Sequence, residues 1–316
     1  MYIQVFKLTC RILFLSSILL ICQTANSAND EGASDLGVDY AFMSLMTLSP
    51  DFAAANYAIH NDGGSDVDIT IGRIPYHIDL MENDHSRLQM ELAFAYQRTE
   101  QIVPTFTTPG ENIDSEWNAY GAGLGILYGY NVNNALLFTP SLRFGVARMV
   151  NHADYNGALT NLLRDQFDGT LFNWETNTRV LNLGIGLEYK WTLLDRSSSL
   201  DADVYHIIVG SFNESNPAVD FNENANMIAV KGDMVFPTGI NIHGKRLDFV
   251  LVLGANDFFG QNRHTLGYTV SYQAGIGAEL PIIVSQKKYG YIRISGHILW
   301  ANNMEGWLLT AGFNSE

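Results

Sequence analysis

The chain has 316 residues, of which 47% are hydrophobic and 12% aromatic, and it carries a formal net charge of −15. So high an apolar fraction excludes a disordered chain, and the excess of 33 acidic over 18 basic side chains argues against nucleic acid as a partner. No run after residue 28 reaches the roughly 18 apolar residues of a membrane-spanning helix, which excludes a helical membrane protein.

The first 28 residues have the order of a secretory signal peptide. Lys7 and Arg11 precede a short apolar run (12–22), and a polar stretch of small residues follows it. The run is too short to span a membrane, so we expect cleavage near residue 28. Both cysteines, Cys10 and Cys22, lie within this segment, and its removal leaves 16 basic and 33 acidic side chains, a net charge of −17. We therefore expect an exported protein without disulfides.

Period-two alternation, which places successive side chains on opposite faces of a strand, is the main structural signal in the rest of the chain. In residues 88–98, 178–191 and 265–280, one face is apolar and includes aromatic residues such as Tyr268, while the other face is small or polar. Weaker alternation marks 66–80, 117–130, 136–149, 200–211, 227–236, 247–255, 289–299 and 307–313. Segments of up to about 15 residues suit tilted membrane strands.

The connectors between these segments tend to alternate between long and short, as in a barrel with tight periplasmic turns and extended outer loops. If the C-terminus lies in the periplasm, one ascending strand must precede 66–80. Residues 52–60 are the candidate, closed by the turn sequence 61–65. The sequence therefore predicts an all-β fold, a transmembrane antiparallel up-and-down β-barrel of about 12 strands within residues 51–316.

Two segments stay outside this strand count. Residues 29–50 include an apolar, Met-containing stretch (36–48) without clear alternation. It is interpreted either as a segment within the barrel lumen or as a frayed terminus or extra strand, and the sequence leaves both open. Residues 158–167 have a short helical pattern in the longest loop, so we expect a loop helix there.

Two patterns resemble enzyme motifs but fit the strand interpretation better. Gly121-x-Gly123-x-Gly125 superficially resembles a nucleotide fingerprint, yet alternation continues through it, so we expect its glycines to face the lumen. The Ser-x-x-Lys pattern of residues 285–288 falls in a predicted periplasmic turn. We expect no catalytic residue, no cofactor and no metal site.

Charged side chains on the non-lipid face are the candidate functional residues, because they would line the lumen. By alternation they are Glu91, Arg143, Glu188, Lys190, Lys231, Asp233, Asp248, Glu279, Arg293 and His297. Since both signs are present, they form either an interior salt-bridge lattice or a pathway for solutes. His297 with Ser295 and Arg293 is either the start of an enzyme site or an interior hydrogen-bonding histidine.

Aromatic residues near the predicted strand ends indicate interfacial girdles, because amphipathic rings favour the membrane–water boundary. These residues are Tyr120, Tyr128, Tyr130, Tyr189, Trp191, Tyr289, Trp300 and Trp307.

The last segment alternates Trp307, Leu309, Ala311 and Phe313, and this pattern resembles the final strand by which outer-membrane proteins are recognised for barrel assembly. It departs from that pattern in the three residues after the aromatic one. Twelve strands, a candidate lumen segment and a Gly-rich early strand together resemble the translocator barrel of autotransporters. No passenger domain fits between residue 28 and the first strand, so residues 36–313 resemble the solitary outer-membrane autotransporter-type β-barrel group.

The resemblance implies residence in the outer membrane of a Gram-negative bacterium and a barrel without a cargo domain. We therefore expect a structural or surface-interaction protein that is not an enzyme. The alternatives are a porin-like solute channel and, third, an outer-membrane lipid hydrolase. The expected partners are outer-membrane lipid, lipopolysaccharide and the barrel-assembly machinery, and the sequence leaves the oligomeric state open.

Overall fold

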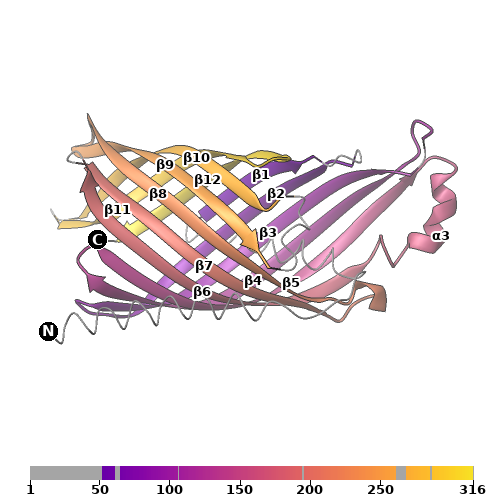
Figure 1. Ribbon diagram of the computed structural model, residues 1–316, viewed down its shortest axis with the longest axis horizontal. Coiled ribbons are helices and arrows are strands. Elements are labelled where there is room, and N and C mark those ends of the chain that lie inside the picture. Colours follow the sequence, from indigo (N-terminus) through magenta and orange to yellow (C-terminus); the bar gives the residue numbers. More distant parts are fainter. Residues whose placement is uncertain are drawn as a thin grey trace.

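The computed structural model describes residues 52–60, 65–105, 107–193, 196–260, 268–284 and 287–315. They form one closed antiparallel barrel of twelve strands, in which sequence neighbours pair and β1 closes the barrel against β12 (Figure 1). The strands are β1 (Phe52–Ile59), β2 (Val67–Glu82), β3 (Ser86–Pro104), β4 (Asn112–Asn133), β5 (Leu136–Asn156), β6 (Glu175–Leu193), β7 (Arg196–Phe212), β8 (Asn222–Ile242), β9 (Lys245–Phe259), β10 (Val270–Val284), β11 (Lys287–Trp300) and β12 (Met304–Ser315). The predicted signal peptide (1–28) and the segment 29–50 lie outside the described residues.

The barrel confirms the predicted fold class and strand number, but several strands are longer than the alternation indicated. β4 spans 22 residues and extends beyond the predicted 117–130 at both ends. The prediction is wrong at the start of β10, which begins at Val270. Tyr268 is 4% exposed instead of lying on the outer apolar face, because its ring packs edge-on against Phe258.

Helices are few and short in the described part of the chain. η1 (Thr160–Leu163) and α3 (Arg164–Phe167) lie in the longest connector, where a loop helix is predicted, and η2 (Pro217–Val219) precedes β8. None of the described helices is long and apolar enough to span a membrane.

The wall of the barrel is apolar outside and polar inside over much of its height. Tyr76, Phe94 and Ile298 point outward and are 64%, 63% and 62% exposed, whereas the inward-facing Glu91 and Asn182 are each 2% exposed. Soluble proteins bury apolar side chains and expose polar ones. This reversed arrangement suits a barrel surrounded by lipid.

The alternation inverts near one end of the barrel. We call this the loop end, because it carries the longer connectors 105–111, 157–174, 213–221 and 260–269, and we call the opposite one the turn end. On β4 the outward row changes from Leu124 and Tyr120 to Asn118 and Glu116 as it approaches the loop end. Buried apolar residues form a cluster on the inner side: Tyr57, Ile59, Ile69, Ile71, Ala119, Ala147, Met149, Trp174, Ile207, Val209, Val219, Phe221, Ala225, Met227, Phe258, Tyr268, Leu299 and Met304. The loop end therefore has the polar surface and apolar interior of a soluble protein.

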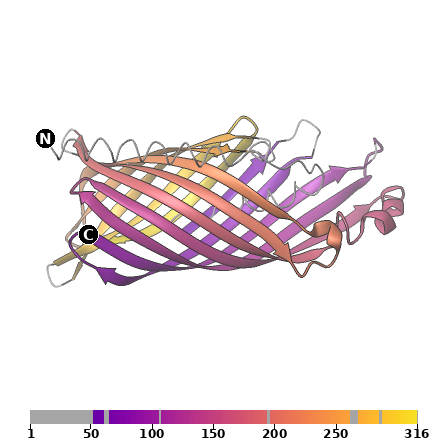
Figure 2. The same cartoon turned by 60° about the horizontal axis from the view of Figure 1, so that its bottom comes forward.

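The strands β3 to β5, with the connector that leads from β5 into β6, continue further at the loop end than the other strands and carry α3 at their far end (Figures 1 and 2). On β4 the polar outward part covers residues 112–118. Seven residues at about 3.4 Å each, tilted by about 45°, rise roughly 15–20 Å above the apolar belt. We call this part the β3–β6 extension.

Candidate functional site: the lumen wall

A buried ion cluster joins three strands on the inner wall. Arg73 Nη2 of β2 donates to Glu91 Oε1 of β3 at 2.7 Å, and Arg143 Nε of β5 donates to the same oxygen at 3.1 Å. His77 Nε2 lies 3.1 Å from Glu91 Oε2. Because Glu91 and Arg73 are only 2% and 3% exposed, their charges depend on these partners and not on water.

Gly125 allows this cluster to form across β4. It is the residue of β4 that pairs with Glu91 on one side and with Arg143 on the other. A Cβ at Gly125 would lie 3.0 Å from Arg143 Cγ and 3.3 Å from Glu91 Cβ. A side chain here would therefore crowd the two charged groups, and the third glycine of the Gly-x-Gly-x-Gly pattern has a packing role.

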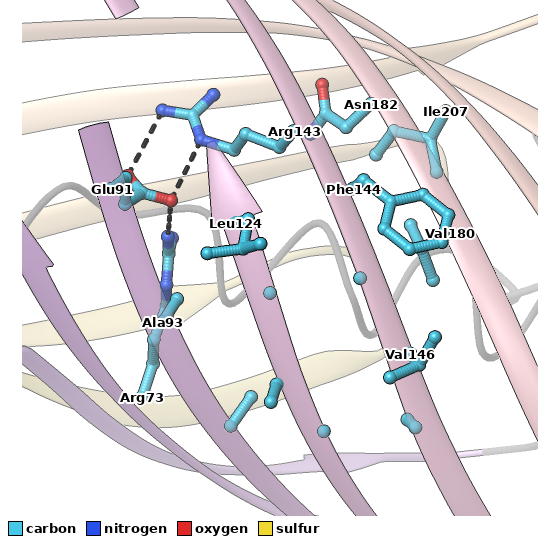
Figure 3. Close-up of a pocket in the computed structure, with 16 residues that line it drawn as sticks. Arg73, Glu91, Ala93, Leu124, Arg143, Phe144, Val146, Val180, Asn182 and Ile207 are labelled. Carbon is cyan, nitrogen blue, oxygen red and sulfur yellow. Dashed lines mark hydrogen bonds and ion pairs between the residues drawn. The ribbon is translucent and has the colours of Figure 1, made fainter. Parts of the chain in front are cut away.

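Small residues next to the ion cluster form a recess in the inner wall, with a volume of about 110 Å³ (Figure 3). Its inward-facing small residues are Ala93, Ala95, Gly121, Gly123, Gly145 and Ala147. Arg73, Glu91 and Arg143 border it, and Val180, Asn182 and Ile207 are among its other lining residues. Strands β3, β4 and β5 thus present little more than backbone to the lumen at this place.

Asn182 is the polar group of this recess. It pairs with Arg143 across the β5–β6 ladder, and Figure 3 shows its amide beside the Arg143 side chain. The residue is 2% exposed, and neither its Oδ1 nor its Nδ2 has a hydrogen-bond partner among the described residues. A buried amide left without partners costs about 1–3 kcal/mol. The recess therefore combines small side chains with one buried amide whose hydrogen-bonding capacity the described residues leave unused.

A second ion cluster lies on the other side of the wall. Arg293 of β11 donates to Asp233 Oδ2 of β8 at 2.5 Å and to Glu279 Oε2 of β10 at 2.9–3.0 Å. The Asp233 contact reaches over two intervening strands, β9 and β10. These side chains therefore connect wall segments that do not pair with one another.

The remaining predicted charges make local contacts. Lys231 Nζ lies 3.5 Å from Asp201 Oδ2, and Lys190 Nζ lies 3.1 Å from Glu188 Oε1. Asp248 contacts Arg246 two residues earlier on β9, at 2.8 Å. Of the ten predicted residues, the structure brings Glu91 and Arg143 into one cluster and Asp233, Glu279 and Arg293 into another. It joins Glu188 to Lys190 as a separate pair, and Lys231, Asp248 and His297 belong to neither cluster.

His297 does not form an enzyme-like site with its neighbours. Its Nε2 lies 3.0 Å from Ser295 Oγ, which lies 2.7 Å from Thr310 Oγ1. Ser295 is 4% exposed, and His297 Nδ1 has no hydrogen-bond partner within the described ranges. A catalytic histidine needs a group that orients its second nitrogen. The described residues also contain no group of three or more His, Cys, Asp or Glu side chains that could hold a metal ion.

Three ionisable residues in these contacts are not among the predicted ones: Arg73 and His77 of the first cluster, and Asp201, which contacts Lys231. Arg73 and His77 follow the same alternation as the rest, since the neighbouring Ile74 and Tyr76 are outward and 57% and 64% exposed. The weak alternation of 66–80 hid them, because it inverts near Gly72. The alternation counted in both directions from Tyr76 could have placed both on the inner face.

The β3–β6 extension ends in an ordered loop. The Glu111 carboxylate accepts hydrogen bonds from Thr160 N at 2.7 Å and Thr160 Oγ1 at 2.8 Å, at the start of η1. The hydrogen bond from the Thr160 backbone is the main cause that lowers the pKa of Glu111. Three leucines of this loop remain exposed: Leu159, Leu162 and Leu171. The tip is therefore a fixed, partly apolar surface.

Comparison with known proteins agrees with this architecture. The family model of the solitary outer membrane autotransporter beta-barrel domain matches residues 65–288. No curated protein matches the chain. The fold is similar to the β domain of the Bordetella autotransporter BrkA, with a TM-score of 0.53 and 12% identity over 84% of this chain and 98% of that chain.

Two further solved structures share the fold. The translocator domain of the autotransporter NalP from Neisseria meningitidis has a TM-score of 0.55 and 9% identity, over 88% of this chain and 93% of that chain. The transport unit of AIDA-I from Escherichia coli has a TM-score of 0.52 and 9% identity, over 88% and 99%. Since the family match covers more than two thirds of the chain, this protein belongs to the solitary outer-membrane autotransporter β-barrel family.

Proposed function

We propose that this protein is a passenger-less outer-membrane barrel with a structural or surface-interaction role, and that its own residues 29–50 occupy the lumen. The observation that carries the proposal is the inner-wall recess with the buried amide of Asn182, which has no hydrogen-bond partner in the described part of the chain. The description of the family as solitary supports the absence of a passenger. Export through a signal peptide cleaved near residue 28 is part of the proposal.

The start of β1 supports this choice of occupant. Ala53 pairs with Arg73, so β1 begins beside the ion cluster that borders the recess. Glycine has no side chain and alanine has a single methyl group, so both allow a close approach of another backbone. The methionines of residues 36–48 suit an irregular cavity, because Met side chains are unbranched and adaptable.

The β3–β6 extension supports a role at the cell surface. It rises above the apolar belt, is fixed by Glu111 at its tip, and exposes leucine side chains there. Proposed partners in the membrane are lipid and lipopolysaccharide, and the barrel-assembly machinery would act during biogenesis.

A solute-conducting channel is the second candidate. The observation that favours it is the lumen wall itself, where charges of both signs line β6 to β11, including Lys231, Glu188 and Asp233. Such a wall could select solutes if the lumen is open. A lipid hydrolase ranks third, since the described Ser295–His297 pair is buried.

Conductance in planar bilayers tests the proposal. Three proteins are compared: the full chain, a deletion of residues 29–50, and a variant in which these residues are replaced by an equally long Gly/Ser segment. We expect low conductance for the full chain and higher conductance for both variants. Unchanged conductance would favour the channel, with the charges alone setting permeability. Failed assembly of both variants would mean that residues 36–48 contain a strand, which also contradicts the proposal.

A further inference from the structure

A row of polar residues lies on the outward face of the barrel, at the boundary of the apolar belt that faces the loop end. In the outer membrane the loop end faces outward, because short turns are periplasmic and long loops are external. On strands β3 to β6 the first polar residues beyond the belt are Arg98, Asn118, Arg148 and Arg179. Three of these four side chains are cationic.

The aromatic residues below this row fix its height. The rings of Tyr96 and Tyr120 lie 5.1 Å apart, and Tyr96 Oη donates to Asn118 Oδ1 at 2.9 Å. Tyrosines of this kind occupy the boundary between acyl chains and headgroups. The arginines directly above them therefore lie at the level of lipid headgroups, where phosphate groups are found.

The rest of the barrel differs in charge at this level. On the opposite side the first charged outward residues beyond the belt are Asp257 of β9 and Glu305 of β12, both exposed. On β3–β6 the same level offers guanidinium groups to an anionic headgroup, and Glu100, Glu116 and Glu175 lie beside them as ion-pair partners. The cationic row thus marks one side of the barrel and is not a uniform girdle.

Two of the arginines are close enough to hold one phosphate. Arg148 pairs with Asn177 on β6, so Arg179 is its diagonal neighbour. Diagonal residues on adjacent strands are about 7–8 Å apart, within reach of long side chains. Arg98 is separated from Arg148 by β4 and by two residues of register, which together correspond to about 12 Å between their Cα atoms.

The guanidinium groups keep donors for a ligand. Arg148 is 63% exposed and contacts Glu175 through Nη2 alone. Arg98 is 43% exposed; its Nη2 serves both Glu100 and Glu116 and its Nε is buried, so Nη1 is the donor left for a ligand. Arg179 is exposed and has no ion-pair partner among the described residues. Guanidinium groups bind phosphate oxygens through two parallel hydrogen bonds.

We propose that Arg148 and Arg179 bind one phosphate of a phosphorylated outer-leaflet glycolipid, the lipid A part of lipopolysaccharide, and that Arg98 binds its second phosphate. The site rests on outer-membrane residence but not on what fills the lumen. Its ligand chemistry is a pair of phosphates at the headgroup level, above acyl chains that contact the belt below Tyr96 and Tyr120.

Native mass spectrometry of the purified full chain in detergent tests the site. The probes are bisphosphorylated lipid A, the same lipid without phosphates, and phosphatidylglycerol. The site variant is Arg148→Gln/Arg179→Gln. The matched control is Arg164→Gln/Lys245→Gln, which removes the same charge from the loop tip and from the turn end. Folding of each variant is checked by heat-modifiable migration in gels.

We expect the site variant to bind bisphosphorylated lipid A at least about tenfold more weakly, since charge-assisted hydrogen bonds are lost, and the control to bind it like the unchanged protein. Equal binding by variant and control would overturn the proposal. So would equal binding of phosphatidylglycerol and lipid A by the unchanged protein, because the site would then accept any anionic headgroup. If the double variant does not fold, Arg179→Gln alone replaces it, because its loss leaves no described carboxylate unpaired.

Discussion

Replacing Glu91 by glutamine should destabilise the barrel strongly. Glu91 is 2% exposed and accepts from Arg73 at 2.7 Å and from Arg143 at 3.1 Å. Glutamine keeps the shape of the side chain but removes its charge. Its NH2 group would also face the N–H groups of Arg73 and Arg143, so donors would meet donors. Removing one partner of a buried ion pair costs about 3–5 kcal/mol, because the other charge stays buried.

The exposed pair Arg87–Asp79 provides the matched control. Its side chains are 32% and 46% exposed, and the distance between Arg87 Nε and Asp79 Oδ1 is 2.6 Å. Because water screens this pair, Asp79→Asn should cost at most about 1 kcal/mol. The difference between Glu91→Gln and Asp79→Asn therefore measures the effect of burial.

The assay is urea unfolding in lipid vesicles, followed by tryptophan fluorescence. Arg143→Gln and the double variant Glu91→Gln/Arg143→Gln complete a cycle, and we expect the double variant to be more stable than the sum of the single losses by about 1–3 kcal/mol. Equal unfolding of Glu91→Gln and Asp79→Asn, or additive losses in the cycle, would refute the reasoning.

Two further predictions use the same assay or hydrogen exchange. Leu183→Arg, on the outward face, should cost about 2–4 kcal/mol near the bilayer midplane and Gln273→Arg, on the inward face, much less; equal tolerance would show that the assigned faces are wrong. Since hydrogen bonds lower the pKa of Glu111, its hold on the loop 157–174 should persist when the pH falls through the ordinary pKa of glutamate and be lost only at lower pH, as Glu111 itself becomes protonated. Protection of that loop from hydrogen exchange measures this. Gly157→Ala should remove the protection at every pH, since Gly157 has a φ of +97° and its Cβ would overlap the Glu111 carboxylate; protection that survives in this variant would contradict the assignment.

The fold could be predicted because lipid on one side and a polar lumen on the other impose alternation on each strand. β6 and β10 show this clearly, since their outward residues are apolar and their inward ones small or polar. Parity then gave twelve strands, including the short β1. An up-and-down barrel needs no other long-range information, because neighbours in sequence are neighbours in the sheet.

Strand ends could not be predicted, because the rule reverses where the strands leave the membrane. On β4, Ile113 is 1% exposed and points inward, whereas Glu116 is outward. Tyr268 was misplaced for the same reason, since an aromatic residue at the loop end joins the inner apolar cluster. An alternation that is followed with apolar residues outward therefore stops where the outward residues become polar, although the strand itself continues.

The ion clusters could not be predicted, because alternation indicates which face of a strand a residue occupies but not its height in the barrel relative to residues on other strands. Glu91 and Arg143 meet through the shared partner Gly125, which depends on the register of two ladders. Asp233 and Arg293 meet across two strands, which depends on the curvature of the closed wall. Sequence parity placed such residues as candidates on the inner face, but only the closed barrel pairs them.

Membrane fractionation with gel analysis tests the central claim, that this chain is an outer-membrane barrel, most directly. After expression in a Gram-negative host, we expect the protein in the outer-membrane fraction, migrating faster in detergent gels before heating than after it, because a closed strand lattice resists unfolding until heated. Recovery as a soluble periplasmic protein with the same migration before and after heating would contradict the account.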